Sequence, residues 1–226
     1  MELRRYKINK KISDNAFDFV IAVGGDGTLL KAAQLVANTP VLHVISNVKV
    51  NESFFGRATA DDFEKKLRQL ISGNFKLLKL LRLESSINGK KLPFLALNEV
   101  FIGSKLPYHT ARYELAVKDK KEEQKSSGVI IATPAGSYAW AKSAGVKPLP
   151  LTAQKFLFVV REPYFGRLTK PKLLCGVLNK NESIGVTSHI NQGIVAIDSK
   201  PKHFSFNEGS KLVVKPSKQH LRLVSW

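Results

Sequence analysis

The first strong hydrophobic pattern of the chain is a short apolar run near its start. The run Phe17–Val23 is nearly continuous, which is typical of a strand buried on both faces. A helical pattern begins near Thr28 and should end near Asn38, because Pro40 cannot continue a helix. The next apolar run, Val41–Ile45, predicts a second strand. Together these segments predict a Rossmann-like βαβ unit with a parallel strand pair and a right-handed crossover.

The pattern then predicts a second helix and a hairpin. The helix is expected between Thr59 and Gly73, with Thr59 as its N-cap and an apolar stripe along one face. From Lys76 the apolar residues alternate with a period of two. The runs Leu77–Ile87 and Leu92–Ile102 are predicted to pair as a β-hairpin, because the Asn-Gly pair between them favours a type I′ turn.

Many short strand-like runs follow along the rest of the chain. The expected strands are Tyr113–Val117, Val129–Ala132, Phe156–Val160, Leu173–Val177, Ile184–Val186, Ile194–Ile197, Phe204–Phe206, Lys211–Val214 and Leu221–Val224. So many short strands after an α/β start predict a second, all-β domain, a sandwich. We therefore predict an α/β domain at residues 1–75, with a further short strand at Leu3–Ile8. The sandwich is expected at residues 76–226, and its last residues are expected to return to the first domain.

Composition and charge narrow the class of protein. The chain has 226 residues, 43% of them hydrophobic, and no apolar run approaches the ~20 residues that span a bilayer. Its single cysteine, Cys175, cannot form an internal disulfide, and the N-terminus has no secretory pattern, so we expect a cytoplasmic location. The net charge of +18 attracts polyanions, but no aromatic and basic residues interleave as in a nucleic-acid module. We therefore expect small anionic substrates, and neither a nucleic acid nor a membrane as partner.

Three glycines and one carboxylate lie between the first strand and its helix, in the sequence Gly24-Gly25-Asp26-Gly27-Thr28. Glycine lets backbone N–H groups approach a ligand, and a helix N-terminus adds free donors, so this turn suits phosphate. An acidic side chain is unfavourable for binding anions alone. Asp26 is therefore expected to accept a proton from a substrate hydroxyl or to hold a metal. The simpler interpretation is a tight strand-to-helix turn with an aspartate cap.

Two later segments carry polar residues next to predicted strands. Asn98 and Glu99 interrupt the apolar run Ala96–Ile102, where burial without partners would be costly. An amide can pair with a purine edge and a carboxylate with ribose hydroxyls, whereas the simpler interpretation is a polar strand end. The second segment, residues 126–145, places a Thr-Pro-Ala-Gly-Ser turn between a strand and a small-residue helix.

These motifs, in this order and at this spacing, resemble the NAD kinase family. The GGDGT sequence at residues 24–28 is the signature of the superfamily that joins NAD kinases, diacylglycerol and sphingosine kinases and, more distantly, phosphofructokinases. Residues 126–145 are similar to the family pattern DGxxxxTPTGSTAYxxSAGG, and residues 193–199 to its late strand that ends in Asp-Gly. Lipid kinases place an Asn-Glu pair soon after GGDGT, whereas here Leu29-Leu30-Lys31 follows, as in NAD kinases.

The resemblance implies transfer of the γ-phosphoryl group of ATP, or in some members polyphosphate, to the 2′-hydroxyl of the adenosine ribose of NAD. It further implies Mg2+ with ATP, a homodimer or homotetramer, and an active site between the two domains. Asp26 would be the catalytic residue, and Gly24, Gly25, Gly27 and Thr28 would lie around the phosphates. The residues implied to bind NAD are Asn98, Glu99, Ser127, Thr133, Tyr138, Ala139 and Ser143.

Several positions depart from the family pattern. Ser127 stands where most of the family has an aspartate, so it cannot charge-pair with the nicotinamide end, and the preference between NAD and NADH stays open. The glycine-rich segment that usually follows Pro40 is missing, and His43 stands there instead. No histidine has metal-ligand spacing to another, so all five histidines are interpreted as structural and no residue is assigned as a metal ligand. Arg161 and Arg167 fall where the family has a loop near the active site, which makes them candidates for phosphate contacts.

The sequence thus predicts an NAD kinase, with two alternatives. One is a kinase for the hydroxyl of a lipid or another small molecule, since GGDGT is shared across the superfamily. The other is a non-catalytic relative that binds a dinucleotide or a nucleic acid without turnover, since the predicted NAD site is altered.

Overall fold

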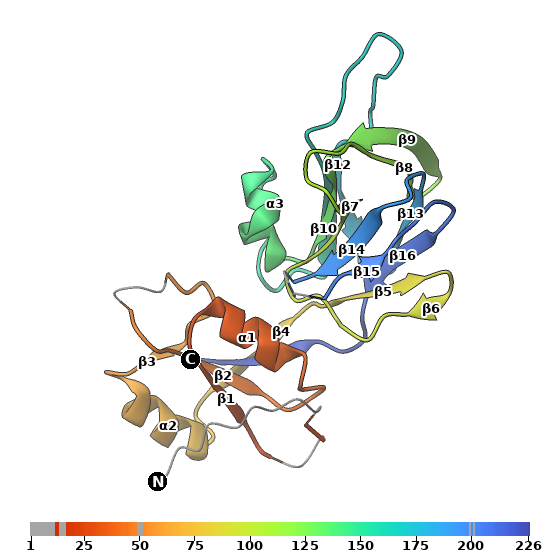
Figure 1. Cartoon of the computed structure of the whole chain (residues 1–226). Helices are drawn as coiled ribbons and strands as arrows, with labels where there is room; N and C mark the ends of the chain where they lie inside the picture. Colours follow the sequence, from red (N-terminus) through yellow and green to blue (C-terminus); the bar gives the residue numbers. More distant parts are fainter. Residues whose placement is uncertain (1–11, 14–16, 49–51, 199, 201) are drawn as a thin grey trace. The chain divides into compact units, whose positions relative to one another are not determined.

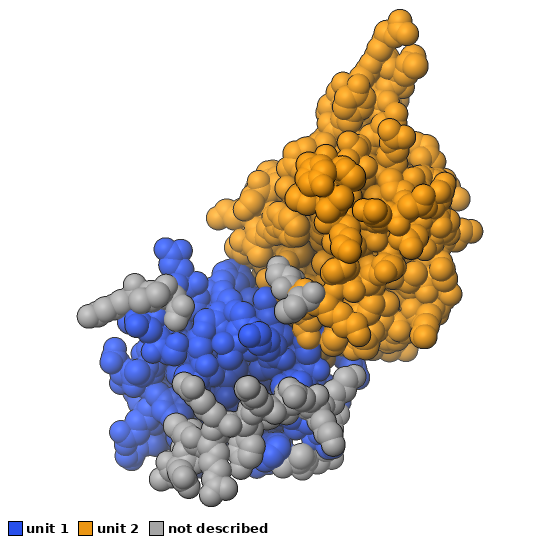
Figure 2. All heavy atoms as spheres, in the orientation of Figure 1, with its two compact units in different colours: residues 1–79, 219–226 blue, residues 80–218 orange. Residues whose placement is uncertain are grey.

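The computed structural model describes residues 12–13, 17–48, 52–198, 200 and 202–226. The chain divides into two compact units, and each has its own core (Figures 1 and 2). The first unit comprises residues 1–79 and 219–226, and the second unit residues 80–218. The predicted strand Leu3–Ile8 lies outside the described residues. No helix in the described part of the chain is long and apolar enough to cross a lipid bilayer.

The first unit is a five-stranded sheet with helices α1 and α2. The sheet order is β1 (Val20–Val23), β2 (Val41–Ile45), β17 (Leu221–Ser225) and β4 (Lys76–Leu80), and β3 (Ala58–Thr59) also pairs with β2. Strands β1 and β2 are parallel, and α1 (Asp26–Ala33) connects them; α2 is Phe63–Ile71. The last strand of the chain, β17, lies parallel to β2 in this sheet. The predicted βαβ unit is therefore confirmed.

Local details of the first unit differ from the predictions. Strand β1 is covered on one face only, because Ala22 is buried while Ile21 and Val23 are 39% and 55% exposed. Helix α1 begins two residues earlier than predicted and ends at Ala33, after which Leu35 N–H donates to Ala32 in the tighter 3₁₀ pattern.

The start of α2 also differs from the predicted cap. The N-cap position is Asp62 rather than Thr59. The Asp62 carboxylate instead accepts hydrogen bonds from the backbone N–H and the hydroxyl of Thr59, at 2.6 and 3.2 Å. The Asp62 carboxylate thus reaches back to Thr59, although Thr59 itself does not cap the helix.

The second unit consists of two six-stranded sheets. One sheet has the order β12 (Cys175–Asn179), β11 (Lys155–Arg161), β10 (Gly128–Ala132), β7 (Glu99–Ser104), β14 (Gly193–Ile197) and β15 (Phe204–Ser205). The other has the order β6 (Lys90–Lys91), β5 (Leu83–Ile87), β16 (Lys211–Pro216), β13 (Ile184–Ser188), β8 (Ala111–Val117) and β9 (Lys120–Ser126). Buried residues of both sheets, such as Val100 and Leu115, form one hydrophobic cluster. The α/β first lobe with a β-sandwich second lobe is therefore confirmed as the fold class.

Two predictions about the strands were wrong. The hairpin around Asn88-Gly89 pairs only β5 with the two-residue β6, and its turn residues have the positive φ angles, 49° and 78°, that a type I′ turn requires. Of the predicted partner, Leu92–Ile102, only Leu92 and Ala96 bond to β5, and its last residues belong to β7 in the other sheet. Strand β9 was not predicted, because its sequence KKEEQKS resembles a solvated charge run; an edge strand tolerates such charges.

Candidate functional site

The glycine turn lies at the carboxyl ends of the parallel strands β1 and β2. The N–H of Gly24 donates to the carbonyl of Val44 at 2.9 Å, which ties the turn to the end of β2. Gly24 has a φ of 152°, and a Cβ there would lie 2.3 Å from the Thr28 hydroxyl oxygen, so only glycine fits. Gly25 is the N-cap of α1 and has no side chain to cap the helix. The first N–H groups of α1 therefore lie at this edge of the sheet, as anion binding requires.

The carboxylate of Asp26, the first residue of α1, is held by the loop after β2. Its Oδ1 accepts hydrogen bonds from the Ser53 hydroxyl at 2.6 Å and from the Phe55 N–H at 3.1 Å. Its Oδ2 accepts one from the Phe54 N–H at 2.9 Å. A carboxylate has about four lone-pair sites, so the contacts described leave one on Oδ2. The side chain is 28% exposed, so this free site can meet a ligand from solvent.

Arg57 is hydrogen-bonded to the same loop. Its guanidinium donates to the carbonyls of Phe54 and Gly56, at 3.4 and 2.9 Å. Burial lowers the pKa of Arg57, and the charge of Asp26 opposes this shift. Gly56 permits a close approach, since a Cβ there would lie 2.4 Å from the Ile45 side chain. The loop that binds Asp26 is therefore fixed by contacts of its own.

The second cluster of predicted residues lies in the second unit, where three strand ends converge. Strand β7 lies between β10 and β14 and is antiparallel to both, so its first residue lies beside their last. Glu99 begins β7, Thr133 follows β10, and Asp198 follows β14. Thr133 donates from its hydroxyl to the Leu97 carbonyl at 2.5 Å and from its N–H to the Asn98 carbonyl at 2.9 Å. The structure thus brings Asn98, Glu99 and Thr133 together.

Asp198 fixes the backbone of this cluster. Its carboxylate accepts three consecutive backbone N–H groups, from Leu97 and Asn98 at 2.7 Å each and from Glu99 at 3.2 Å. The residue itself has a φ of 48°, in the left-handed region. Asp198 had been assigned only to a late strand, and its role as an anchor for Asn98 and Glu99 was not predicted.

Burial shifts the charges of this cluster. It raises the pKa of Glu99 to about 8, and the negative charge of Asp198 adds to the shift, so Glu99 is mainly protonated at neutral pH. Burial also raises the pKa of Asp198 to about 6, against the opposing effect of its three N–H donors. Arg82 is 1% exposed, and burial lowers its pKa to about 10 while Asp198 opposes this. At neutral pH Asp198 and Arg82 thus carry opposite charges within the same buried part of the second unit.

Two atoms of the cluster are buried and lack a hydrogen-bond partner among the residues described. They are Oδ1 of Asn98 and Oε2 of Glu99. Buried polar atoms are rarely left unpaired, so such atoms at strand ends are candidates for contacts with a ligand. They are the acceptor of an amide and an oxygen of a largely protonated carboxyl group, which suits a base edge and a sugar hydroxyl.

The turn after β10 packs closely against the same strand. A Cβ on Gly136 would lie 2.0 Å from the Asn98 carbonyl oxygen, so glycine is required for this approach. Ser137 is buried, donates to the Pro134 carbonyl and accepts from the Leu149 N–H. Tyr138, Ala139 and Ser143 follow on the short helical segments Gly136–Tyr138 and α3 (Trp140–Ser143), and Tyr138 is 39% exposed.

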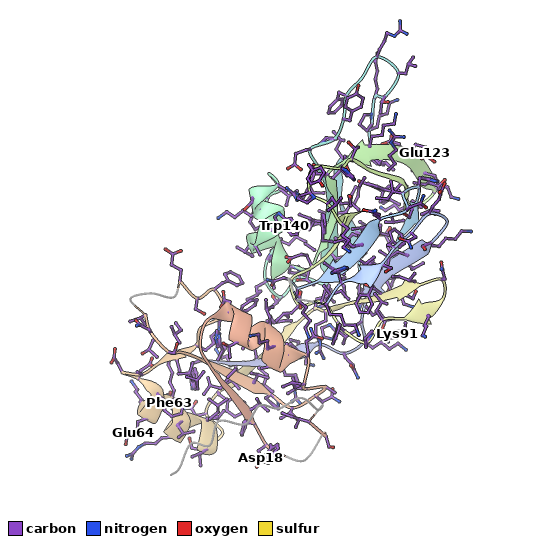
Figure 3. The ribbon with its side chains drawn as sticks, in the orientation of Figure 1. Asp18, Phe63, Glu64, Lys91, Glu123 and Trp140 are labelled. Atoms are coloured by element: carbon purple, nitrogen blue, oxygen red, sulfur yellow. The ribbon has the colours of Figure 1, made fainter. Side chains whose placement is uncertain are left out.

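The remaining predicted residues lie away from Asn98 and Glu99. Ser127 precedes β10, at the opposite end of that strand from Thr133, and its N–H donates to the Arg161 carbonyl. The Arg161 guanidinium lies over the ring of Trp140, labelled in Figure 3, and pairs with Glu162. Arg167 is exposed in the long loop between β11 and β12. The structure therefore does not gather these three residues with the Asn98 cluster.

Several site residues were missed by sequence reasoning. Ser53, Arg57 and His43 contact the glycine turn or its loop, and Arg82 lies beside Asp198. The only local signal was Arg82, a single charge within the apolar run Leu80–Leu83. No group of three or more His, Cys, Asp or Glu side chains in the described ranges could hold a metal ion.

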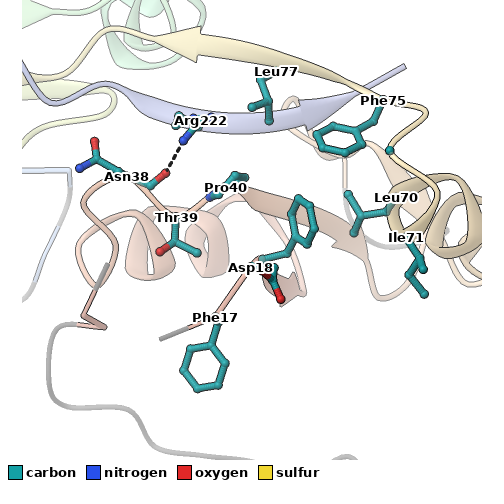
Figure 4. A pocket seen from close by; sticks show the side chains of 12 residues that line it. Phe17, Asp18, Asn38, Thr39, Pro40, Leu70, Ile71, Phe75, Leu77 and Arg222 are labelled. Atoms are coloured by element: carbon teal, nitrogen blue, oxygen red, sulfur yellow. Dashed lines mark hydrogen bonds between the residues drawn. The ribbon is translucent and has the colours of Figure 1, made fainter. Parts of the chain in front are cut away.

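A cavity of about 780 Å3 in the first unit contains none of the predicted site residues (Figure 4). Its lining includes Asp18, Pro40 and Arg222, whose guanidinium donates to the Asn38 carbonyl at 3.2 Å. Asp18 and Pro40 precede β1 and β2, so the cavity lies at the amino ends of these strands, whereas the glycine turn lies at their carboxyl ends.

Comparisons with known proteins find NAD and NADH kinases. Residues 4–75 match the family model of the ATP-NAD kinase N-terminal domain. The chain is 29% identical to a probable NADH kinase of Oryza sativa subsp. japonica, over 99% of this chain and 75% of the rice protein. It is 26% identical to an NAD kinase of Thermoplasma volcanium, over 97% of this chain and 78% of that protein.

Two solved structures share the fold. Yeast NADH kinase complexed with NADH has a TM-score of 0.82 and 20% identity, and the match covers 93% of this chain and 62% of the yeast chain. An NAD kinase from Archaeoglobus fulgidus in complex with ATP has a TM-score of 0.76 and 23% identity, over 96% of this chain and 81% of that chain. This chain thus spans less than two thirds of the yeast enzyme.

The geometry of the glycine turn predicts unequal effects of two alanine substitutions. Gly24→Ala should destabilise the first unit by about 1–3 kcal/mol, because it forces an L-residue to a positive φ against Thr28. Gly27→Ala is the matched control: nothing lies within 4 Å of its Cβ, and alanine favours a helix by about 1 kcal/mol. Urea unfolding of both variants tests this. Equal stabilities would contradict the described turn.

The buried carboxyl group of Glu99 predicts a pH-dependent effect on stability. Because the folded pKa is raised to about 8 from 4.5, the folded state holds the proton more tightly, and the free energy of unfolding falls as pH rises between these values. Glu99→Gln removes this loss, so the variant should gain stability over the wild type by roughly 4 kcal/mol between pH 5 and pH 8.5. Glu162→Gln, whose side chain is 61% exposed, should show no such trend in urea unfolding. A constant difference across pH for Glu99→Gln would contradict the buried, protonated state.

Proposed function

We infer that the chain belongs to the NAD kinase family, and we propose that it phosphorylates the 2′-hydroxyl of the adenosine ribose of NAD with ATP to give NADP. The observation that carries the proposal is the carboxylate of Asp26 at the N-terminus of α1, held by three hydrogen bonds with one lone pair free. A glycine turn that suits phosphate thus carries a carboxylate that can receive a hydroxyl proton.

In the proposed reaction Asp26 acts on the attacking hydroxyl. The 2′-oxygen forms a bond to the γ-phosphorus while the bond from that phosphorus to the bridging oxygen of ADP breaks, and ADP leaves with the electron pair. The proton of the hydroxyl passes to the Asp26 carboxylate. The backbone N–H groups of Gly25, Asp26 and Gly27 would donate to the phosphates, since those of Gly24 and Thr28 already donate to the Val44 and Gly25 carbonyls, and the N-terminal end of α1 favours negative charge.

The nucleoside end of NAD is proposed to lie on the Asn98 cluster of the second unit. The unpaired Oδ1 of Asn98 would accept from an adenine amino group, and the carboxyl group of Glu99 would bind ribose hydroxyls. Thr133 positions this strand end, while Tyr138, Ala139 and Ser143 would line the dinucleotide site. Arg161 and Arg167 remain proposals for phosphate contacts.

Mg2+ is proposed to enter with ATP rather than to sit in a protein-built site. The described residues contain no cluster of three metal-ligating side chains, and three of the lone-pair sites of Asp26 already accept hydrogen bonds. The ion would neutralise phosphate charge when bound. We also propose that the protein forms a homodimer or homotetramer, lies in the cytoplasm and can use polyphosphate as phosphoryl donor.

NADH is a further candidate substrate. Two of the similar proteins are named NADH kinases, and Ser127 carries no charge to pair with the oxidised nicotinamide. We therefore propose that the chain accepts NADH as well as NAD.

The first experiment is direct. The purified chain, incubated with ATP, Mg2+ and NAD or NADH, should form NADP or NADPH, measured with a coupled dehydrogenase. Diacylglycerol and sphingosine with labelled ATP are the comparison substrates, and their phosphorylation in place of NAD would identify the alternative kinase. Binding of NAD without any product would identify a non-catalytic protein.

The role of Asp26 predicts a selective loss of turnover. Asp26→Asn keeps an oxygen for the loop N–H groups but cannot take up the proton, so kcat should fall by about 10²- to 10⁴-fold with the KM for ATP nearly unchanged. Asp61→Asn, at an exposed position of the same unit, should leave kcat unaffected. Steady-state kinetics measure both; an unchanged kcat in Asp26→Asn would refute the role of this carboxylate.

Ser127 offers a test of cofactor preference. Ser127→Asp should raise the ratio of kcat/KM for NAD to that for NADH by about two- to fivefold, because a carboxylate at this partly exposed position would pair only weakly with the positive nicotinamide ring. Ser127→Asn is the uncharged control and should leave the ratio unchanged. An equal ratio in all three proteins would mean that Ser127 does not contribute to the recognition of the nicotinamide.

A further inference from the structure

One peptide group of the loop after β2 is bonded at both ends to charged side chains. It joins Phe54 to Phe55. Its N–H donates to Oδ1 of Asp26 at 3.1 Å, and its carbonyl oxygen accepts from the Arg57 guanidinium at 3.4 Å. N–H and C=O point in opposite directions in a trans peptide, so the N–H end meets the negative charge and the oxygen end the positive one. Both charges therefore favour the same orientation of this peptide dipole.

The Arg57 guanidinium holds a second peptide group of the same loop. It donates to the carbonyl oxygen of Gly56 at 2.9 Å. The N–H of that peptide group belongs to Arg57 itself and donates to the carbonyl oxygen of His43 in β2 at 3.0 Å. Arg57 directly precedes β3, which pairs with β2. One guanidinium thus orients two peptide groups of the loop, and the second of them is tied to the sheet.

Helix α2 in turn holds the backbone of Arg57. Nζ of Lys66 donates to the Arg57 carbonyl oxygen. The same ammonium group pairs with Asp62 at 2.8 Å and lies 5.1 Å from the centre of the Trp226 ring, which follows β17. The negative charge of Asp62 offsets that of Lys66, so a second cation beside Arg57 is tolerated. The loop is therefore anchored to α2 as well as to β2.

These contacts bear on Asp26 because the loop fills most of its hydrogen-bonding capacity. The Ser53 hydroxyl and the N–H groups of Phe54 and Phe55 occupy three of its about four lone-pair sites. The terminal torsion of an aspartate has a broad energy minimum, so the donors decide how the carboxylate is turned. The loop therefore sets the direction of the remaining lone pair on Oδ2.

Burial of the loop's own side chains does not explain this orientation. Phe55 is 2% exposed, and its ring packs edge-on against that of Phe54 with 5.0 Å between the ring centres. Apolar burial is non-directional, so it keeps the loop in place without aiming its N–H groups. The hydrogen bonds of the Arg57 guanidinium are directional and act on the carbonyl groups of the same backbone.

We propose that Arg57 is a positioning residue for Asp26, which holds the oxygen ends of two peptide groups and so keeps the loop N–H groups directed at the carboxylate. Lys66 assists by holding the Arg57 carbonyl oxygen. The expected effect on turnover rests on the proposed function, whereas the effect on the loop does not. Phosphoryl transfer depends on such positioning, since a displacement of 1 Å can cost about 100-fold in rate.

The state of the loop can be tested without any assay of activity. Arg57→Met keeps an unbranched side chain but removes the charge and the donors. NMR hydrogen exchange should then show the amide hydrogens of Phe54 and Phe55 exchanging at least about fivefold faster than in the wild type. Arg68→Met is the matched control, because Arg68 is 79% exposed on α2 and pairs with Glu64. Unchanged exchange in Arg57→Met would overturn the proposal.

A double-mutant cycle separates positioning from other roles of Arg57. Arg57→Met should lower kcat about tenfold and leave the KM for ATP within about twofold. In the Asp26→Asn background the same substitution should lower kcat by less than about twofold, because the group that Arg57 positions is already disabled. Arg68→Met should leave kcat unchanged in both backgrounds. A tenfold loss that persists in the Asp26→Asn background, or a raised KM for ATP, would mean that Arg57 acts on the substrate or on the fold, and would overturn the proposal.

The two tests distinguish this inference from the proposed function. If exchange is faster in Arg57→Met but the wild type forms no NADP, the positioning of Asp26 stands and the proposed function fails. If the wild type forms NADP while Arg57→Met matches it in exchange and in kcat, the function stands and the inference fails. Should Arg57→Met not fold, Lys66→Met decides: it should speed exchange of the same two amide hydrogens by about twofold, and unchanged exchange would overturn the proposal.

Discussion

Both candidate sites depend on the same kind of interaction, in which one carboxylate accepts hydrogen bonds from three consecutive residues of a distant segment. In the first unit Asp26 accepts from Ser53, Phe54 and Phe55, which pins the loop after β2 to the glycine turn. A carboxylate at a helix N-terminus is favourable for the helix dipole, and the hydrogen bonds from the loop hold the Asp26 carboxylate at that position. The same contacts therefore stabilise α1 and orient the group that we propose to be catalytic.

The second unit contains the same kind of interaction, but its carboxylate is buried. Asp198 gathers the N–H groups of Leu97, Asn98 and Glu99, and so fixes the strand end that carries the unpaired polar atoms. Its side chain is almost fully buried, and the buried cation of Arg82 lies in the same interior. An unpaired charge there would be strongly destabilising, so the three donors and the cation together make a buried carboxylate tolerable.

Sequence reasoning found the elements whose signals are local. The glycine turn between an apolar run and a helical pattern, and most of the short strands, follow from a few adjacent residues. The partners of Asp26 could not be found this way, because Ser53 is 27 residues away and no local pattern marks it. Strand β9 was missed because its sequence is highly charged. Such charges are compatible with a strand at the edge of a sheet, and only the pairing of strands shows that β9 lies there. His43 was interpreted as structural because no other histidine lies at metal-ligand spacing from it, and no local pattern indicates its contact with the Gly24 carbonyl.

The two carboxylates also show why hydrogen bonding alone does not identify a reactive group. Asp26 and Asp198 each accept three hydrogen bonds, yet Asp26 is 28% exposed and keeps a free lone pair, whereas Asp198 is 5% exposed. Because Asp26 is partly exposed, it can contact a substrate, whereas Asp198 only holds the backbone of residues 97–99. The net charge of +18 does not produce this difference, because the described contacts balance the charges of each site locally, with Arg57 near Asp26 and Arg82 near Asp198. The surplus of lysine and arginine acts instead as a field around the molecule that favours the approach of anionic substrates.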